Sequence, residues 1–258
     1  MEYTEILFST TGPIGCLTLN NPSKVNALSL TMIGEITDAL SRVAADEPVK
    51  VVIIKAAGKH FCAGHYLVEM IDHGVKEYQA IFDNCTEMMQ LIHDIPQPVI
   101  AQVHGIATAA GCQLVAACDL AVAEEGARFA TPGVKIGVFC TTPMVALTRA
   151  IGRKAAMEML LTGRYVSAAE AKDLGLINRV VSLNDLTQAT EELAEQIAVS
   201  SRMVIAIGKR AFYAQVDQPD TKAYEVAKPT MVMNLLTEDA QHGIKSFLEK
   251  KTPDWRDR

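Results

Sequence analysis

Short apolar runs that alternate with helical segments are the feature that most constrains this fold. The segments 51–56, 98–103 and 119–124 read VVIIKA, PVIAQV and DLAVAE, and each has the length of a buried strand. Between the first hairpin and these strands, apolar residues recur at three- and four-residue steps over 30–46, behind a possible cap at Ser29. Further helices are expected at 76–93 and, built from small residues, at 109–117. Regular alternation of strand and helix predicts an α/β fold.

The two ends of the chain add a hairpin and a helical region. Residues 5–8 and 15–19 flank the turn-like TTGP and predict an opening hairpin. From Pro143 onward the pattern is almost wholly helical. No repeat, low-complexity segment or Gly/Ser linker divides the 258 residues. We therefore expect one domain, with a core over 1–195 and a C-terminal helical region over 196–258.

Charge and cysteine content exclude several classes of protein. A net charge of −6 argues against a nucleic-acid partner, because such proteins usually present a basic face. The amino terminus lacks the pattern of a secretion signal, and no stretch reaches the roughly 18 to 20 apolar residues of a membrane span. The six cysteines form no C-x-x-C pair and are expected to be reduced thiols. Together these features predict a cytoplasmic protein without a membrane partner.

Two segments place small residues where an expected strand leads into a helix. They are GKHFCAGHYLVEM at 58–70 and HGIATAAGCQL at 104–114. The first N–H groups of a helix have no intrahelical acceptor, and the helix dipole adds positive potential there. Two such turns can form an oxyanion hole, which holds a substrate oxygen as it gains negative charge. The alternative is that both are only close-packed turns. The sequence has no phosphate-loop, dinucleotide, zinc-protease or serine-hydrolase motif.

Six segments, in order, resemble the crotonase superfamily, also called the enoyl-CoA hydratase/isomerase family, over almost the whole chain. They are NNPSKVNALS, GKHFCAGHYLVEM, PVIAQVHGIATAAGCQL, RFATPGVKIG, AIGRKAAMEMLLTGRYVSAAEAKDLGLINRVV and GIKSFLEKKTPDW. Within the superfamily, HGIATAAGCQLVAACDLAVA and FATPGVKIGVFCTTP are most similar to one subgroup. The resemblance implies an α/β, ClpP-like spiral of ββα units with a C-terminal helical trimerisation region. It also implies a homotrimer, or a hexamer built as a dimer of trimers, that binds an acyl-CoA thioester between core and helical arm.

The resemblance assigns the oxyanion hole and the coenzyme A contacts to particular residues. Backbone N–H groups of His65 and Ala110 are implied donors to the thioester carbonyl. Positions that match the family's nucleotide contacts are Lys24, Val25, Ala63 and His65 and, from a neighbouring subunit's tail, Phe247 and Lys250. Coenzyme A is part of the substrate, and no separate cofactor is implied.

Two positions depart from the pattern of a hydratase. Such enzymes use two glutamates to activate water and deliver a proton, and the matching positions here are Gln113 and Gly133. A glutamine amide orients water but cannot accept a proton near neutral pH, and glycine has no side chain. Tyr66 stands where the family often has an acidic residue. Ordinary hydration of an enoyl-CoA is therefore not expected to be efficient.

Other titratable residues are weaker candidates for catalysis. The His65 ring can act as an acid or base if it enters the pocket. Cys140 is a possible nucleophile, although the sequence shows no adjacent base and favours a buried, inert thiol. Glu69 is a possible substitute base, whereas Glu124 fits a polar turn. The remaining histidines lack metal-ligand spacing, so no metal site is expected.

Two functional classes remain open. The first is an enzyme of acyl-CoA metabolism, a hydratase or isomerase with a nonstandard acid or base such as water held by Gln113; thioester hydrolysis belongs to this class. The second is an acyl-CoA-binding protein without efficient turnover.

Overall fold

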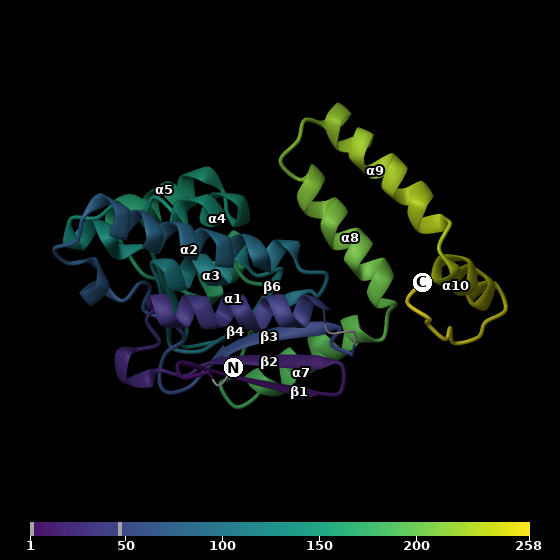
Figure 1. Cartoon of the computed structure of the whole chain (residues 1–258), viewed down its shortest axis with the longest axis horizontal. Coiled ribbons are helices and arrows are strands. Elements are labelled where there is room, and N and C mark those ends of the chain that lie inside the picture. Colours follow the sequence, from purple (N-terminus) through teal and green to yellow (C-terminus); the bar gives the residue numbers. More distant parts are fainter. Residues whose placement is uncertain (1–2, 46–47) are drawn as a thin grey trace.

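A six-stranded sheet forms the centre of the molecule, with strand order β1-β2-β3-β4-β6-β9 (Figure 1). The computed structural model describes residues 3–45 and 48–258. The strands are Ile6–Thr11 (β1), Ile14–Leu19 (β2), Val51–Ala56 (β3), Val99–Val103 (β4), Leu120–Glu124 (β6) and Arg179–Val181 (β9). The expected hairpin is confirmed, because β1 and β2 pair antiparallel. The other neighbours pair parallel.

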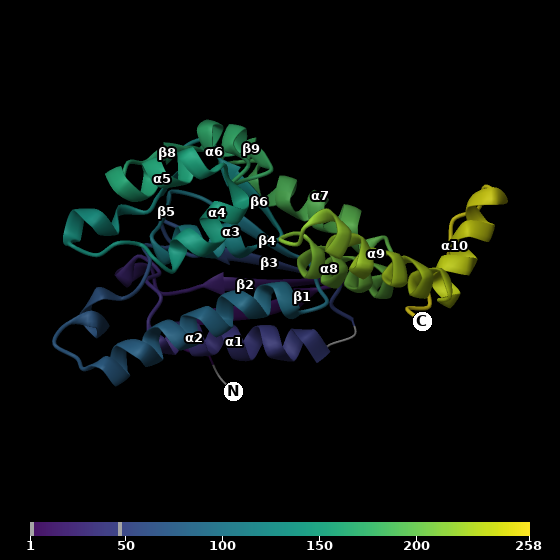
Figure 2. The ribbon, with the colours of Figure 1, turned by 90° about the horizontal axis from the view of Figure 1, so that it is seen from above.

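Helices cover both faces of this sheet. Leu30–Ala45 (α1), Val75–Asp94 (α2) and Ala110–Ala117 (α3) belong to the larger core on one face, and Leu186–Ala198 (α7) packs on the other (Figure 2). Successive β3 side chains point to opposite faces, so Val52 and Ile54 join the larger core and Val51 and Ile53 join the smaller one. Burial on both faces explains the continuous apolar run that predicts this strand.

The cap expected for α1 is present, because the Met32 N–H donates to the Ser29 hydroxyl at 3.0 Å. The predicted helix extended to Asp46, which lies outside the described residues, as do Met1 and Glu2 of the amino terminus considered above.

A second sheet has three short strands, and the chain passes from the first sheet to the second in repeated strand–strand–helix units. Its strands are Ile106–Thr108 (β5), Arg128–Ala130 (β7) and Val166–Ser167 (β8). The chain passes from β4 to β5 and then into α3, and from β6 to β7 and then into Pro132–Ile136 (η3) and Pro143–Ala150 (α4). Each turn gives one strand to each sheet and then a helix. The second sheet was not predicted, since its strands have only two or three residues.

The C-terminal third is helical, as expected. It continues with Arg153–Thr162 (α5), Ala168–Leu174 (α6), Arg202–Gln215 (α8), Asp220–Leu235 (α9) and Glu238–Leu248 (α10). Figures 1 and 2 show α8, α9 and α10 as an arm beside the core, with α9 running back along α8 and α10 at its outer end. The expected division at 195/196 falls inside α7 and stays a prediction.

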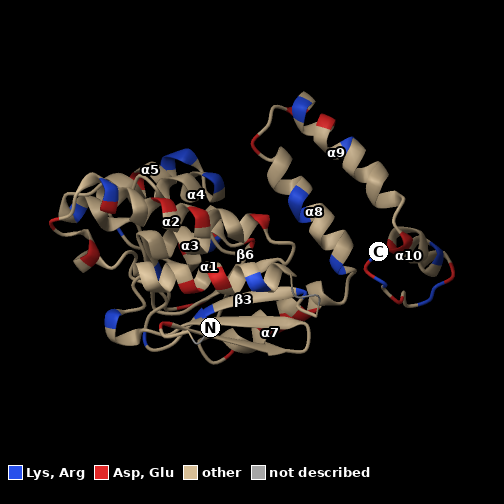
Figure 3. Ribbon diagram, in the orientation of Figure 1, with Lys and Arg blue, Asp and Glu red and all other residues tan. Residues whose placement is uncertain are grey.

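Exposed apolar side chains collect on the last two helices of the arm. Met231, Val232 and Leu236 of the α9 end and Phe247 and Leu248 of α10 are each more than half exposed. Figure 3 shows few charges along that end of α9. Among the described residues, no helix is both long and apolar enough to cross a membrane.

Candidate active site

The backbone N–H of His65 is turned away from its neighbouring strand residue. Leu28 forms a parallel bridge with His65: the Leu28 N–H donates to the Gly64 carbonyl at 2.7 Å, and the Tyr66 N–H donates to the Leu28 carbonyl at 3.1 Å. Both bonds use the residues that flank His65, so its own N–H points to the other side. Within the described part of the chain, this N–H has no hydrogen-bond acceptor.

Ala110 is the first residue of α3, and its N–H has no acceptor among the described residues either. The preceding residue, Ala109, has φ 51° and ψ −118°, a region that glycine adopts far more easily than alanine. The Ala109 N–H donates to the Ala130 carbonyl at 2.9 Å, which holds this conformation. Ala110 itself does not have a positive φ, so the backbone strain lies at Ala109, one residue before the expected donor. No residue type in the sequence marks it.

The two turns approach each other so closely that they leave no room for larger side chains. A Cβ on Gly64 would lie 2.9 Å from the Ala109 Cβ and 3.3 Å from the Ala110 nitrogen. A Cβ on Gly111 would lie 2.4 Å from the Cys62 carbonyl oxygen. The small residues therefore place the His65 and Ala110 backbones side by side, at the wall of one cavity.

That cavity has a volume of about 310 Å³ and an apolar lining. Its walls come from the turn at Ala63, from Leu67–Met70 (η2), from α2 and from the segment after β7. The apolar side chains are those of Leu67, Met70, Phe82, Pro132, Ile136, Val138, Phe139 and Pro143. Lys135 contributes the one charged side chain of the lining. Such a space suits an acyl chain, and its low polarity strengthens hydrogen bonds made at its wall.

The His65 ring also lines this cavity. Its Nε2 is buried without a hydrogen-bond partner among the described residues, and the ring meets the edge of Phe82 at a centroid distance of 5.4 Å. Burial lowers the pKa of His65 to about 4. The imidazole is therefore neutral near pH 7 and is a weak base.

Gln113 lies one helical turn after Ala110 and faces a neighbouring cavity of about 270 Å³. Its side chain is almost fully buried, and its Oε1 has no hydrogen-bond partner in the described chain. Thr142 lines both cavities, so Gln113 lies near the first cavity without lining it. The amide oxygen is free to accept a hydrogen bond from water.

Gly133 lines the first cavity where its wall is tightest. A Cβ there would lie 2.4 Å from the Val138 carbonyl oxygen and 2.8 Å from the Cys140 Sγ. The φ of Gly133 is not positive, so a steric contact, and not backbone conformation, excludes a side chain. Cys140 also lines the cavity, and burial raises the pKa of its thiol, which is protonated at neutral pH.

Three of the expected coenzyme A contacts lie together beside the cavity. The Ala63 N–H donates to the Val25 carbonyl at 3.1 Å, and Ala63 also lines the cavity. The Lys24 ammonium lies 4.5 Å from the centre of the Tyr66 ring and 3.6 Å from Glu5. This places Tyr66 with the expected nucleotide site, since it does not line the cavity at His65 and Ala110.

Phe247 and Lys250 do not line this cavity. They lie at the outer end of the arm, where Phe247 is 82% exposed (Figure 1). The structure thus does not bring them together with Lys24 within one chain.

The candidate carboxylates have other roles. Glu69 accepts a hydrogen bond from the Leu30 N–H at 2.9 Å and so adds to the start of α1. Glu124 is the last residue of β6, directly before the turn at 125–126, and it accepts a hydrogen bond from the Gly105 N–H at 2.6 Å. Across residues 3–45 and 48–258, no group of three or more His, Cys, Asp or Glu residues could hold a metal ion.

Comparison with known proteins defines the class to which this fold and cavity belong. The enoyl-CoA hydratase/isomerase family model matches residues 9–258. A crystal structure of an enoyl-CoA hydratase from Mycobacterium smegmatis superposes with a TM-score of 0.96 at 47% identity, covering 98% of this chain and 99% of that one. The chain therefore belongs to the enoyl-CoA hydratase/isomerase family, and its fold is the crotonase fold expected from the resemblance.

Within the family, the chain falls in the subgroup of enoyl-CoA hydratase domain-containing protein 3, as the two quoted segments predict. The mouse protein of that name is 47% identical over 240 residues, which are 93% of this chain and 80% of the mouse protein. The crystal structure of the human protein has a TM-score of 0.95 at 44% identity and covers 98% of this chain and 100% of that one.

The expected cytoplasmic location is wrong on this comparison. The mouse, frog, rat, zebrafish and human relatives are all named mitochondrial, which points to mitochondria and not to the cytoplasm. The features behind the expectation were reduced thiols and the absence of a secretion pattern. Both argue against export and do not discriminate between compartments inside the cell.

Proposed function

We propose that this chain binds an acyl-CoA thioester, polarises the thioester carbonyl between the N–H groups of His65 and Ala110, and acts on an enoyl-CoA. The observation that carries the proposal is that neither N–H group has an acceptor among the described residues, while both residues line one apolar cavity. Donors aimed at an oxygen that gains negative charge contribute about 3 kcal/mol each to stabilising a transition state. The enolate that forms is the intermediate common to hydration and isomerisation.

The coenzyme A part of the substrate is proposed to lie across Lys24, Val25 and Ala63, with Phe247 and Lys250 supplied by a second copy of the chain. The first three already lie together. Exposure of Phe247 on the arm supports the second part, because 82% of this apolar residue is left in water in the described part of one chain. Coenzyme A enters the site as part of the thioester substrate, and no separate cofactor is proposed.

The acid and base of the reaction are proposed to differ from those of a typical hydratase. Gln113 holds a water through its free Oε1 but cannot take its proton, and Gly133 offers no group at all. His65 is neutral, and its low pKa makes it a poor proton acceptor. Hydration through water held by Gln113 is therefore expected to be slow.

A second candidate is an acyl-CoA-binding protein without efficient turnover. The tight contacts at Gly133 favour it. A side chain does not fit at the position where a hydratase has its second glutamate, so this acid or base is absent. Isomerisation of the enoyl group and hydrolysis of the thioester remain alternatives within the enzyme class.

The test combines binding and turnover on the same preparation. Calorimetry with crotonyl-CoA, acetyl-CoA and free CoA should show micromolar binding of the thioesters. If none binds at about millimolar concentration, a level that corresponds to only about −4 kcal/mol, the proposed site is wrong. Assays of hydration, isomerisation and CoA release on short, medium and aromatic enoyl-CoA substrates then decide between enzyme and binding protein.

A further inference from the structure

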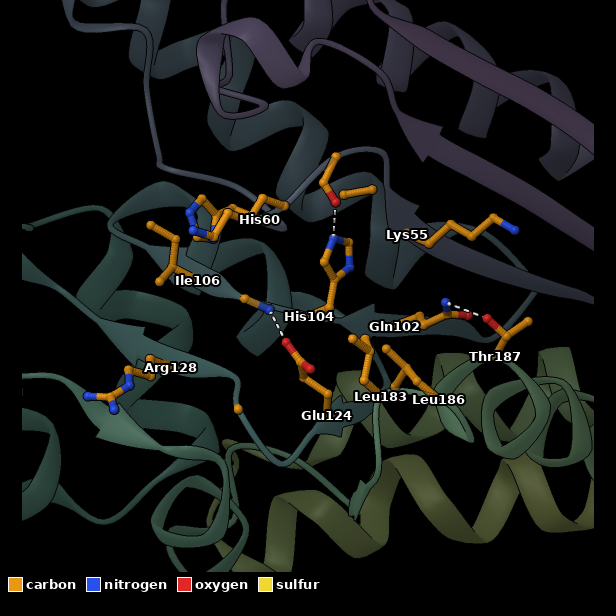
Figure 4. Close-up of a pocket in the computed structure, with 15 residues that line it drawn as sticks. Lys55, His60, Gln102, His104, Ile106, Glu124, Arg128, Leu183, Leu186 and Thr187 are labelled. Atoms are coloured by element: carbon orange, nitrogen blue, oxygen red, sulfur yellow. Dashed lines mark hydrogen bonds between the residues drawn. The ribbon is translucent and has the colours of Figure 1, made fainter.

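A second hollow lies at the carboxyl ends of β3, β4 and β6, apart from the candidate active site. It has a volume of about 790 Å³ and shares no lining residue with the cavity at His65 and Ala110. Residues after each of these parallel strands line it, and the start of α7 closes one side (Figure 4). In open parallel sheets this edge is where ligands commonly bind. The hollow also falls within the size range of small-molecule sites.

Positive charge without a partner gathers in this hollow. Lys55, Lys59 and Arg128 line it, and none of them forms an ion pair within residues 3–45 and 48–258. Glu124 is the one acidic side chain of the lining, and it already accepts a hydrogen bond from the Gly105 N–H at 2.6 Å. In a chain whose net charge is −6, such a concentration of free cations is a local exception. A concave surface of one sign of charge attracts ligands of the opposite sign.

Two imidazoles, those of His60 and His104, also line the hollow. The His104 Nε2 donates to the Gly58 carbonyl at 2.9 Å, so this hydrogen bond does not involve Nδ1 of the same ring. The His60 Nδ1 is buried and has no partner among the described residues. Burial, and then the nearby charges of Lys59 and His104, lower the pKa of His60. The neutral His60 ring lies beside the Lys59 charge, and a bound anion would offset that charge.

The arrangement of the side chains defines the class of ligand. Figure 4 shows Arg128 and Lys55 toward opposite ends of the hollow, with His104 between them, His60 beside Ile106, and Leu183 and Leu186 along one side. We propose that this hollow binds a small organic anion that carries two or more phosphate or carboxylate groups. Cations at both ends match the separated charges, and the leucines match the carbon skeleton between them.

The loop between the two sites makes coenzyme A itself the main competing explanation. A Cβ on Gly58 would lie 2.5 Å from the Pro22 Cβ, so this loop packs directly against the segment that carries Lys24. If the hollow only received the phosphates of coenzyme A, anion binding would depend on Lys24 as well. The proposed site instead depends on the residues that line the hollow.

The experiment measures anion binding to the full chain by calorimetry at low ionic strength, with tripolyphosphate, adipate and inorganic phosphate as probes. We expect tripolyphosphate or adipate to bind with a Kd below about 1 mM, and inorganic phosphate at least about tenfold more weakly. A preference for tripolyphosphate would indicate a polyphosphate ligand, and a preference for adipate a dicarboxylate. Ring resonances of His60 and His104 should shift during the titration.

Matched variants locate the binding. Lys59→Gln with Arg128→Gln should weaken binding of the preferred probe at least about tenfold. Arg153→Gln with Lys154→Gln removes the same charge from exposed residues of α5 and should change it less than about twofold. Thermal melts confirm that both fold. If a variant fails to fold, the histidine resonances of the unmodified chain decide.

Three results would overturn the proposal. They are no binding by the unmodified chain at about 10 mM probe, equal loss in the two double variants, and loss caused by Lys24→Gln instead. The Lys59→Gln and Arg128→Gln chain should still bind crotonyl-CoA as the unmodified protein does. This comparison separates failure of the anion site from failure of the proposed acyl-CoA function.

Discussion

At the residue scale, single atoms decide what this active site can do. The Gln113 amide has a free oxygen but no basic group, the His65 imidazole is neutral, and Gly133 has no space for a side chain. The proposed N–H donors, by contrast, belong to the backbone and do not depend on residue type. The chain thus keeps the groups that would bind and polarise a thioester while it lacks those that usually transfer protons.

Gln113→Glu should raise the rate of crotonyl-CoA hydration. A positioned base commonly contributes 10²- to 10⁴-fold, and one glutamate without its partner should give about tenfold. The measurement is kcat for hydration, with folding checked by thermal melt. An unmodified chain with a kcat above about 10 s⁻¹ would contradict this interpretation of Gln113 and Gly133, and His65 would become the first candidate base.

Gly133→Ala should destabilise the protein, because its Cβ would meet the Val138 carbonyl at 2.4 Å. Overpacking of this kind costs about 1 to 3 kcal/mol. Gly34→Ala is the matched control: nothing lies within 4 Å of a Cβ there, and the helical position should gain about 0.5 to 1 kcal/mol. Urea denaturation of both variants measures the free energy of unfolding. Equal stability of Gly133→Ala and the unmodified chain would show that the loop from 133 to 140 adapts freely. The same contact argues against restoring a glutamate at this position.

His65 should make the protein less stable as the pH falls from about 6.5 to about 4. Its folded pKa of about 4 lies below the ordinary value of 6.5, so the unfolded state binds the proton first in this window. At pH 5 the loss from this group is about 2 kcal/mol relative to pH 7. His65→Phe should remove that part of the pH dependence in denaturant titrations at the two pH values. If the free energy of unfolding changes equally with pH in the His65→Phe variant and the unmodified chain, the imidazole is not buried as described.

At the scale of elements, the helical arm is held to the core by a buried ion pair at α8. The Lys209 ammonium, 6% exposed, donates to the Asp119 carboxylate at 2.7 Å and to the Ile92 and Gln97 carbonyls. Tyr213, one turn further along α8, donates to the same carboxylate at 2.8 Å. These polar contacts join the arm to the core at α8, whose described residues are otherwise half-buried or exposed.

Lys209→Ala should release α8 from the core. Removing one partner of a buried pair costs about 3 to 5 kcal/mol, because the Asp119 charge stays behind. Amide hydrogen exchange should accelerate in α8. Lys222→Ala, which breaks only an exposed pair with Glu225 on α9, should cost less than about 1 kcal/mol. Unchanged exchange in α8 would mean that its apolar contacts alone hold the arm.

At the scale of the whole molecule, the exposed apolar residues of α9 and α10 argue for association of several copies. The chain should be a trimer or a dimer of trimers, because a single copy leaves Phe247 and its apolar neighbours in water. Light scattering at micromolar concentration measures the mass, and a monomer would contradict the prediction. Phe247→Ala should then weaken CoA binding more than it changes the thermal melt of the core.

Residues that are close in the sequence define the local elements of this protein. The run at 51–56 predicts β3 because both of its faces are buried, and Ser29 predicts the start of α1 because its hydroxyl accepts an N–H within the same turn. Both depend on residues near in sequence. The resemblance of six ordered segments to the enoyl-CoA hydratase/isomerase family predicted the fold class, and the family match confirms it.

The contacts between distant segments became visible in the three-dimensional arrangement of the chain. It showed that Gly133 is closed by Val138, that Ala109 carries the positive φ, and that Gly64 packs against the start of α3. It also brought Lys55 and Arg128 to one hollow, although more than seventy residues separate them in the sequence. Hydrophobic periodicity reports which face of an element is buried. It carries no information on which atoms of another element lie against that face, and the chemistry of both sites depends on those atoms.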